Sequence, residues 1–316
     1  MRFPFEATSR IAGYIAKKKL SRAKKFPMVL MLEPLHACNL TCTGCGRIRE
    51  YSQTIKQKLT IDECLAAVDD CGAPVVSICG GEPMIYPGIG ELTAKILERK
   101  KVVYLCTNGM FIRKKIADFK PNNRFFFNVV FDSAIDGVKA AKEAGHLVCT
   151  NTTVFKETDM NELDELFGHL TGIGVDGFLI SPGYGYDAVA DKGMFLTRAD
   201  IRAKFRAAEA MFRKYRFYTS PIYLEFLQGK RELSCTAWAN PTRNIKGWKG
   251  PCYLITDTHH PTFGDLIDKT NWENYGPGRD PRCENCMMHS GFETSAALGV
   301  NSRLGDTPKM VKWQFL

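Results

Sequence analysis

The chain has 316 residues, of which 45% are hydrophobic, and this is enough to bury one large core or a large core and a small one. It has no apolar run of about 18 residues or more, so the sequence predicts no membrane-spanning helix. Twelve cysteines follow no secretory signal, which predicts a cytoplasmic protein whose thiols are ligands, core residues or reactants. The net charge is +9, but no nucleic-acid-binding motif accompanies it, so we expect no nucleic-acid partner.

Residues 1–26 are predicted to form a basic amphipathic segment. Its apolar positions are followed by a crowded set of cations: Lys17, Lys18, Lys19, Arg22, Lys24 and Lys25. Such a helix can bind an anionic lipid surface, which would place the protein peripherally at the inner face of the membrane. It can equally be a solvated helix that covers one end of a barrel, and the sequence leaves both alternatives open.

Residues 27–216 alternate between strand-like and helix-like segments. The strand-like runs are 28–32, 75–79, 102–106, 125–131, 147–154 and 177–181. Thr60 begins one helix with a capping box, and Asn161 and Thr197 are expected to begin two later helices. Hydrophobicity that is continuous along each run is typical of parallel strands buried on both faces. The pattern predicts an α/β fold, a partial (β/α)6 TIM-like barrel with its reactive site at the carboxyl ends of the strands.

Residues 217–316 are predicted to form a smaller, irregular C-terminal domain that contains cysteines. Four of them have the ligand count of a second metal centre: Cys235, Cys252, Cys283 and Cys286. A second iron–sulfur cluster and tetrahedral zinc both fit these residue types, and ordinary buried thiols are the third alternative.

The most informative motif is Cys-x3-Cys-x2-Cys, formed by Cys38, Cys42 and Cys45 directly after the first strand-like run. Three thiolates can hold three irons of a [4Fe–4S] cube and leave the fourth iron open. A zinc site with His36 as fourth ligand, or cysteines that bind no metal, are the alternatives. The spacing resembles the radical S-adenosylmethionine (SAM) superfamily, in which SAM chelates the open iron.

Further motifs make the resemblance more specific. They lie at 80–83, 104–109, 150–153, 180–184, 235–238, 250–254 and 280–293. Together with the cysteine loop they resemble the adenosylhopane synthase (HpnH-like) family of hopanoid biosynthesis, nearly end to end. Gly44 stands where radical SAM enzymes usually have an aromatic residue, and this departure favours that family. Two features depart from the family's own pattern: Val130 replaces a histidine and is followed by a shortened loop before the next helix, and Ser290 replaces a cysteine.

The resemblance implies an enzyme that cleaves SAM reductively and adds the 5′-deoxyadenosyl radical to a hopene (diploptene). It implies a [4Fe–4S] cluster on the three cysteines, a lipid-like triterpene substrate and a flavodoxin- or ferredoxin-type electron donor. Gly80 and Gly81 are expected to let backbone carbonyls approach the SAM ammonium, because a Cβ would block that approach, and Glu82 and Pro83 to fix this turn. The side-chain amides of Asn108 and Asn151 are expected either to hydrogen-bond to the ribose or carboxylate or to satisfy local backbone groups.

The product radical requires a hydrogen-atom donor, and a thiol is suited to this role. Cys106 is the expected donor, with Cys79 and Cys149 as alternatives, although a strand cysteine can also be a small buried hydrophobe. Two competing functions remain. One is a radical SAM enzyme of the same architecture that abstracts hydrogen from a different, smaller substrate, and the other is a metal-stabilised binding protein without turnover.

Overall fold

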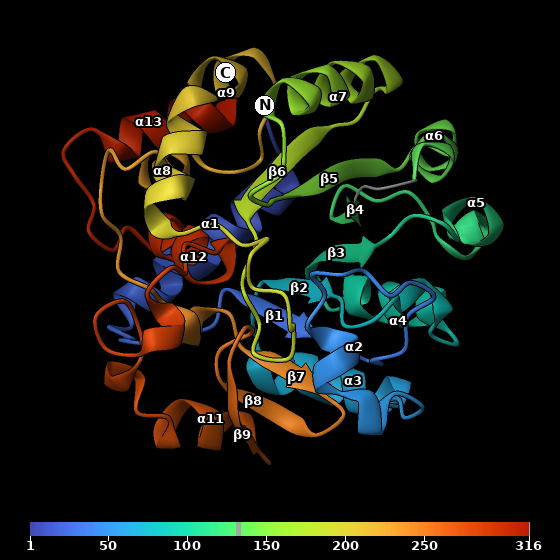
Figure 1. The fold of residues 1–316 in the computed structure, drawn as a ribbon. Helices are drawn as coiled ribbons and strands as arrows, with labels where there is room; N and C mark the ends of the chain where they lie inside the picture. The colour runs from blue at the N-terminus through green and yellow to red at the C-terminus, as the bar shows by residue number, and fades with distance from the viewer. Residues whose placement is uncertain (131–133, 316) are drawn as a thin grey trace.

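The computed structural model describes residues 1–130 and 134–315. Its strands form one sheet in the order β6-β5-β4-β3-β2-β1-β7-β8-β9 (Figure 1). They are β1 (Val29–Leu32), β2 (Val75–Ile78), β3 (Val102–Thr107), β4 (Phe125–Val130), β5 (Leu147–Val154), β6 (Gly177–Pro182), β7 (Thr242–Asn244), β8 (Gly247–Pro251) and β9 (Thr256–His260). Strands β1 to β6 pair in parallel and in sequence order, as predicted for a partial TIM-like barrel.

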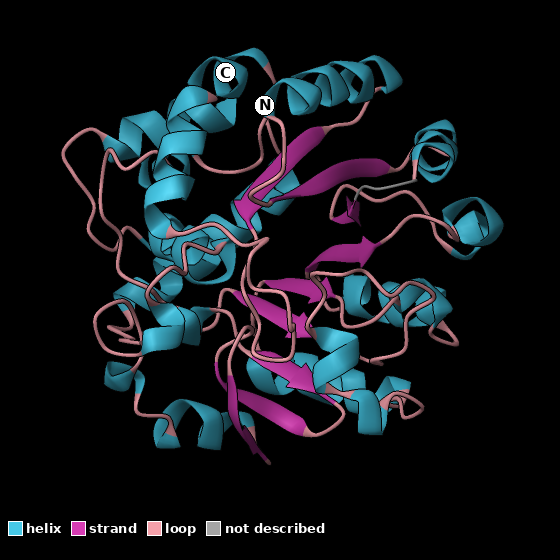
Figure 2. Cartoon of the chain, viewed as in Figure 1, coloured by secondary structure: helices cyan, strands magenta, loops and turns pink. Residues whose placement is uncertain are grey.

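Helices follow the parallel strands and cover the outer face of the sheet, as Figure 2 shows. The α-helices among the described residues are α1 (Phe5–Leu20), α2 (Arg47–Glu50), α3 (Ile61–Cys71), α4 (Ile89–Glu98), α5 (Ile112–Lys115), α6 (Ile135–Glu143), α7 (Met160–Ile173), α8 (Arg198–Ala207), α9 (Glu209–Lys214), α10 (Pro221–Leu227), α11 (Phe263–Lys269), α12 (His289–Leu298) and α13 (Asp306–Phe315). On the open side of the barrel, α10 contacts α8, α12 and α13.

Local sequence signals place most helix starts correctly. Thr60 forms the predicted capping box with Glu63, and Thr197 caps α8 in the same way. Asn161 is not the first residue of its helix, because the side chain of Asp159 accepts the amide of Asn161 and α7 begins at Met160. The short loop expected after Val130 lies outside the described residues.

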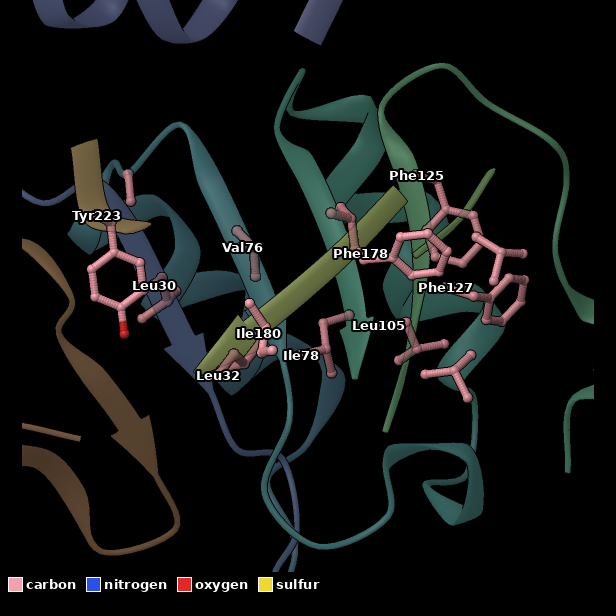
Figure 3. Packing of buried hydrophobic residues seen from close by; sticks show 14 of the residues in the cluster. Leu30, Leu32, Val76, Ile78, Leu105, Phe125, Phe127, Phe178, Ile180 and Tyr223 are labelled. Carbon is pink, nitrogen blue, oxygen red and sulfur yellow. The ribbon is translucent and has the colours of Figure 1, made fainter. Parts of the chain in front are cut away.

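Alternate residues of each strand face two different cores. Val76, Ile78 and Leu105 belong to the large core between the strands and the outer helices, where Phe125 and Phe127 also lie (Figure 3). Val75, Val102 and Phe126 point to the barrel interior and form a smaller cluster there. Towards the carboxyl ends of the strands the interior positions include Cys106 of β3 and Asn128 of β4, so the lower barrel is packed and its upper part carries polar and thiol groups.

The N-terminal helix closes the lower end of the barrel. Phe3, Ala7 and Ile11 pack into the interior cluster, where the ring centres of Phe3 and Tyr218 are 4.2 Å apart. The apolar side of α1 therefore covers the barrel end, which is one of the two alternatives predicted for this segment. Among the residues that the structure describes, no helix is long and apolar enough to cross a membrane.

The C-terminal region is more regular than the sequence suggests. β7 pairs in parallel with β1, and β8 and β9 continue the sheet as an antiparallel hairpin. These strands are short and rich in Gly, Lys and His, so they give little hydrophobic signal, and the sequence predicts an irregular segment here. Its position beside β1 brings the C-terminal cysteines to the same end of the molecule as the cysteine loop.

Candidate functional site

The cysteine loop joins β1 to α2 at the carboxyl end of the barrel. Cys38 and Cys45 are half-buried and Cys42 is exposed, so all three thiols are accessible at the barrel mouth. Two backbone features shape the loop: the amide of Cys45 bonds to the carbonyl of Cys42 at 3.1 Å, and Arg49 Nη1 donates to the same carbonyl at 2.9 Å. The end of the loop is thus held by one backbone bond and by the guanidinium of Arg49.

The donor set fits a [4Fe–4S] cluster. The amide of Leu40 donates to Cys38 Sγ at 3.4 Å, and bonds of this kind to cluster sulfurs are among the features that set a cluster's potential. Burial raises the pKa of the Cys38 thiol, and Glu82 and the two other cysteines raise it further. In the metal-free chain this thiol is therefore protonated, and iron binding must displace its proton. His36, the alternative zinc ligand, is fully buried and bonds through Nδ1 to Thr54 Oγ1 at 3.1 Å, away from such a role.

Gly80 and Gly81 follow β2 and lie directly against the cysteine loop. The amide of Gly81 bonds to the carbonyl of Leu35 at 3.1 Å, and the amide of Glu82 bonds to that of Ala37 at 2.8 Å. Gly80 has a φ of 107°, and a Cβ on Gly81 would overlap the Ala37 carbonyl. From the sequence, this glycine pair is predicted only to allow the approach of SAM. The geometry shows a second reason for it: the backbone of the turn after β2 packs directly against the backbone just before Cys38.

Glu82 connects the turn after β2 with the end of β3. Its buried carboxylate accepts the amide of Met84 at 2.8 Å, Thr107 Oγ1 at 2.7 Å and the amide of Asn108 at 2.8 Å. Asn108 in turn donates to Asn39 Oδ1 at 2.8 Å and accepts the amide of Met110, so its amide satisfies the cysteine loop and local backbone. Asn151 is half-buried on the interior side of β5, the same side as Cys149.

Two aromatic rings that the sequence did not single out cover glycines of the cysteine loop. A Cβ on Gly44 would lie 3.1 Å from the ring of Phe155, which follows β5. A Cβ on Gly46 would overlap the ring of Tyr186, which follows β6. Phe155 therefore occupies the space beside Gly44, where the superfamily pattern usually has an aromatic side chain. No local signal reveals such a substitution, because the ring comes from a residue more than a hundred positions away.

Buried charges lie beneath the loop. Arg47 Nε pairs with Glu33 Oε1 at 2.9 Å, Arg47 Nη1 pairs with Glu50 Oε2 at 3.0 Å, and Lys249 of β8 pairs with Glu50 Oε1 at 3.4 Å. We call these four residues the Glu33 network. The side chains of Glu33 and Lys249 have 0% exposure and that of Arg47 has 4%. The network joins the end of β1, the residue after the cysteine loop and the C-terminal hairpin.

The network keeps its charges although it is buried. Burial alone would raise the pKa of Glu33, but Arg47, a hydrogen bond from His36 and Lys249 lower it to about 2. Burial and the neighbouring Arg47 lower the pKa of Lys249 to about 8. At neutral pH, Glu33 is ionised and Arg47 is its principal counter-charge.

Cys106 lies on the interior side of β3, beside polar groups of the neighbouring strands. Its Sγ is 3.2 Å from Ser77 Oγ and 3.3 Å from Asn128 Nδ2, and Asn128 Oδ1 also accepts a weak bond from Cys149 at 3.5 Å. Of the three candidate thiols, Cys79 and Cys149 are buried and Cys106 is partly exposed. Burial raises the pKa of Cys106, so its sulfur retains hydrogen at neutral pH.

The four C-terminal cysteines come together. Cys235, Cys252, Cys283 and Cys286 all line one cavity of about 330 Å³, which Ser290 also borders. Burial raises the pKa of Cys235 to about 12 and that of Cys283 to about 11, so the metal-free thiols are neutral.

Comparison with known proteins identifies two regions of the chain. Residues 32–130 match the radical SAM superfamily, and residues 178–310 match a domain of unknown function, DUF3463. GTP 3′,8-cyclase 2 of Pseudomonas aeruginosa is 28% identical over 160 residues, which are 43% of this chain and 48% of that protein. The chain thus matches about half the length of that cyclase.

Two longer matches extend over most of the chain. The antilisterial bacteriocin subtilosin biosynthesis protein AlbA of Bacillus subtilis is 23% identical across 93% of this chain and 73% of its own. The crystal structure of Streptococcus suis SuiB bound to the precursor peptide SuiA superposes with a TM-score of 0.61, at 18% identity, over 88% of this chain and 74% of that chain. The structural likeness shows a common fold.

The backbone contact at Gly81 generates the first prediction. Gly81→Ala should lower the iron bound by the cysteine loop after anaerobic reconstitution several-fold, because the new Cβ displaces the Ala37 carbonyl and with it the start of this loop. Gly13→Ala in α1 is the control: nothing lies within 4 Å of its Cβ, and alanine favours a helix by about 1 kcal/mol. Equal iron content in the two variants would contradict the packing role of Gly81.

The Glu33 network generates the second prediction. Glu33→Gln should lower the free energy of unfolding at pH 7 by about 3 kcal/mol, because it leaves the Arg47 charge buried without its partner. Glu91→Gln removes the partner of Lys95 in an exposed pair at 2.8 Å and should cost less than about 1 kcal/mol.

Urea unfolding measures both variants across pH. The folded pKa of Glu33, about 2, lies below its usual value of 4.5. The stabilisation is therefore complete above the usual value and is lost as pH falls towards 2, so wild type and Glu33→Gln should converge in acid. A constant difference from pH 5 to pH 2 would contradict this assignment.

Proposed function

Because the chain belongs to the radical SAM superfamily, with a [4Fe–4S] cluster and SAM as cofactors, we propose that it transfers the 5′-deoxyadenosyl group of SAM to the alkene of a hopene. The observation that supports this reaction best is the partly exposed Cys106 thiol on the interior side of β3. A radical that adds to an alkene leaves a carbon radical on the product, and a hydrogen atom from this thiol can quench it.

The loop residues have the following roles in the proposal. Cys38, Cys42 and Cys45 bind the cluster, and Gly80 and Gly81 bring backbone carbonyls to the ammonium of SAM. Glu82 and Pro83 hold that turn. The side-chain amides of Asn108 and Asn151 orient the ribose or carboxylate of SAM. Asn151 does so directly, and Asn108 does so through its bond to Asn39. When bound, the cluster supplies one electron to the sulfonium, which releases methionine and the 5′-deoxyadenosyl radical.

Cys106 ends the reaction. Its S–H bond breaks homolytically, the hydrogen atom forms a C–H bond at the product radical, and a sulfur radical remains. One electron from a flavodoxin- or ferredoxin-type donor and one proton from solvent restore the thiol. Ser77 and Asn128 hold the sulfur on the interior side of β3 at 3.2 and 3.3 Å.

A second candidate function is hydrogen abstraction from a different substrate by the same radical. Val130, at the end of β4, is 42% exposed where the adenosylhopane synthase pattern has a histidine, and this changes the barrel mouth. SuiB, which shares the fold, was crystallised with a precursor peptide, so a peptide is one such substrate. This reaction releases free 5′-deoxyadenosine and forms no adenosyl adduct.

Product analysis separates the two functions. Anaerobic incubation with diploptene, SAM and a reductant in D2O should give a saturated adenosyl adduct with one added deuterium, because a thiol exchanges with solvent. Cys106→Ala should still form the carbon–carbon bond but should lose that deuterium and the saturated product. Cys71→Ala, which removes a buried thiol of α3, should behave as wild type.

Two outcomes would overturn the proposal. Release of 5′-deoxyadenosine without any adduct would favour hydrogen abstraction. Normal saturated product from Cys106→Ala would remove this residue from the mechanism, and Cys149 and Cys79 would be tested next.

A triterpene resides in a bilayer, so the protein must meet a membrane surface. We assign this contact to the cations of the α1 segment, because its apolar side chains cover the barrel end. Most of these cations are exposed, as are Leu20 at 85% and Phe5 at 67%.

Replacing Lys17, Lys18, Lys19, Arg22, Lys24 and Lys25 by glutamine should abolish sedimentation with vesicles that contain phosphatidylserine, since each cation near such a surface contributes about 1 kcal/mol. Wild-type binding should weaken as the salt concentration rises. Glutamine at Lys114 and Lys115 of α5 is the control and should leave binding unchanged. Undiminished binding of the six-residue variant would contradict the assignment.

A further inference from the structure

A cavity of about 290 Å³ is bordered by the end of α10, by the segment that follows it and by the beginning of α13. Its charged lining residues are Glu225, Lys230, Arg231, Arg303, Asp306 and Lys309. Lys230 also pairs with Glu209, which lies outside the cavity, at 2.7 Å. None of these residues belongs to the candidate site described above, and the proposed reaction uses none of them.

Arg231 is the buried cation of this lining. Its side chain is 1% exposed, and its Nη2 donates to both carboxylate oxygens of Asp306, at 2.8 and 3.1 Å. Its Nε is 3.8 Å from Glu225 Oε2, which is an ion pair but is too long for a hydrogen bond. Nε and Nη1 therefore have no hydrogen-bond partner among the described residues. Donors left unpaired in a buried guanidinium are costly, and a ligand with several acceptor oxygens would remove that cost.

The two carboxylates of the cavity are already paired with its cations. Lys309 Nζ pairs with Glu225 Oε1. Asp306 accepts the amide of Arg303 at 2.7 Å, in addition to its two bonds from the buried guanidinium. The side chain of Arg303 donates to the carbonyl of Lys230 at 3.2 Å, and within residues 1–130 and 134–315 it pairs with no carboxylate. The exposed charge of Arg303 is thus left for an anion that enters the cavity.

The beginning of α13 favours an anion as well. The first turn of a helix carries the positive end of its dipole, and α13 has 10 residues. Gly305 precedes this turn with a φ of 94°, and nothing lies within 4 Å of the position that its Cβ would take. Leu304 borders the same cavity and is fully exposed, so an apolar surface lies beside the cations.

We propose that this cavity binds a phosphate group that is carried by a small organic molecule. Arg231 and Arg303 supply guanidinium donors, whose planar fork suits the oxygens of phosphate, and Leu304 contacts the organic part. A volume of roughly 300 Å³ is the lower end of the range for small-molecule sites, and a bare phosphate fills only part of it. A soluble phosphate ester and the headgroup of a lipid both present this chemistry.

Isothermal titration calorimetry of the full chain with glycerol 3-phosphate tests the site without any turnover. Wild type should bind this ester saturably, and Arg303→Gln should bind it about tenfold more weakly, because a hydrogen bond between charged groups is lost. Arg231→Lys keeps a charge beside Asp306 but removes the forked donors, so it should weaken binding by a similar factor. Arg113→Gln in α5 removes an exposed arginine that pairs with Asp136 at 2.7 Å, and it should bind as wild type does.

A short-chain lipid separates the two sources of phosphate. Dihexanoyl phosphatidic acid is titrated below the concentration at which it forms micelles. If it binds about tenfold tighter than glycerol 3-phosphate and Leu304→Ser removes this gain, a lipid headgroup is the ligand. Equal affinity for the two compounds, unchanged in Leu304→Ser, would assign the site to a soluble phosphate ester.

Two results would overturn the proposal. One is that neither phosphate compound binds saturably to wild type, and the other is that Arg303→Gln binds as tightly as wild type. If Arg231→Lys does not fold, Arg303→Gln decides, because Arg303 is exposed and its loss leaves the buried pair of Arg231 and Asp306 in place. Failure to form an adenosylhopane adduct would leave these affinities unchanged, so this test and the test of the proposed function are separate.

Discussion

The pairing of Arg47 with Glu33 is the interaction on which the arrangement of the site depends. Glu33 lies at the end of β1 and Arg47 lies just after the cysteine loop, so their contact at 2.9 Å closes the loop from below. Glu50 and Lys249 extend the pairing to the C-terminal hairpin. Charges that are fully buried are costly unless each one is paired, and here the cost of separating them holds three segments in one arrangement.

Glycines determine how closely the loops above this network approach. Gly81 allows the turn after β2 to touch the backbone before Cys38, and Gly44 and Gly46 make room for rings that come from the ends of β5 and β6. The loop is thus fixed from below by charge and from the sides by backbone and ring contacts. A loop held in this way keeps Cys38, Cys42 and Cys45 together at the barrel mouth.

The sequence predicted the parts of this molecule that follow local rules. Continuous apolar runs gave the six parallel strands, and the Thr60 and Thr197 caps gave two helix starts, because each depends on neighbouring residues. The cysteine spacing and the Gly80 turn likewise are local. Glu33, Arg47 and Lys249 read as ordinary surface charges in the sequence, since only the folded chain brings residues 33, 47 and 249 together. Phe155 and Tyr186 were missed for the same reason, and the hairpin β8–β9 was missed because its strands lack apolar alternation.

The closure of the barrel by α1 also bears on the order in which the molecule assembles. Phe3 packs on Tyr218, and its carbonyl accepts a bond from Gln314 Nε2, a residue 311 positions later. A ribosome releases α1 long before either partner exists, and contacts between residues so distant form slowly. Through most of translation the helix therefore has its apolar side uncovered beside a row of lysines. The nascent chain thus exposes, for a limited time, an apolar helix side that the folded protein covers, whereas most of the neighbouring cations stay exposed after folding.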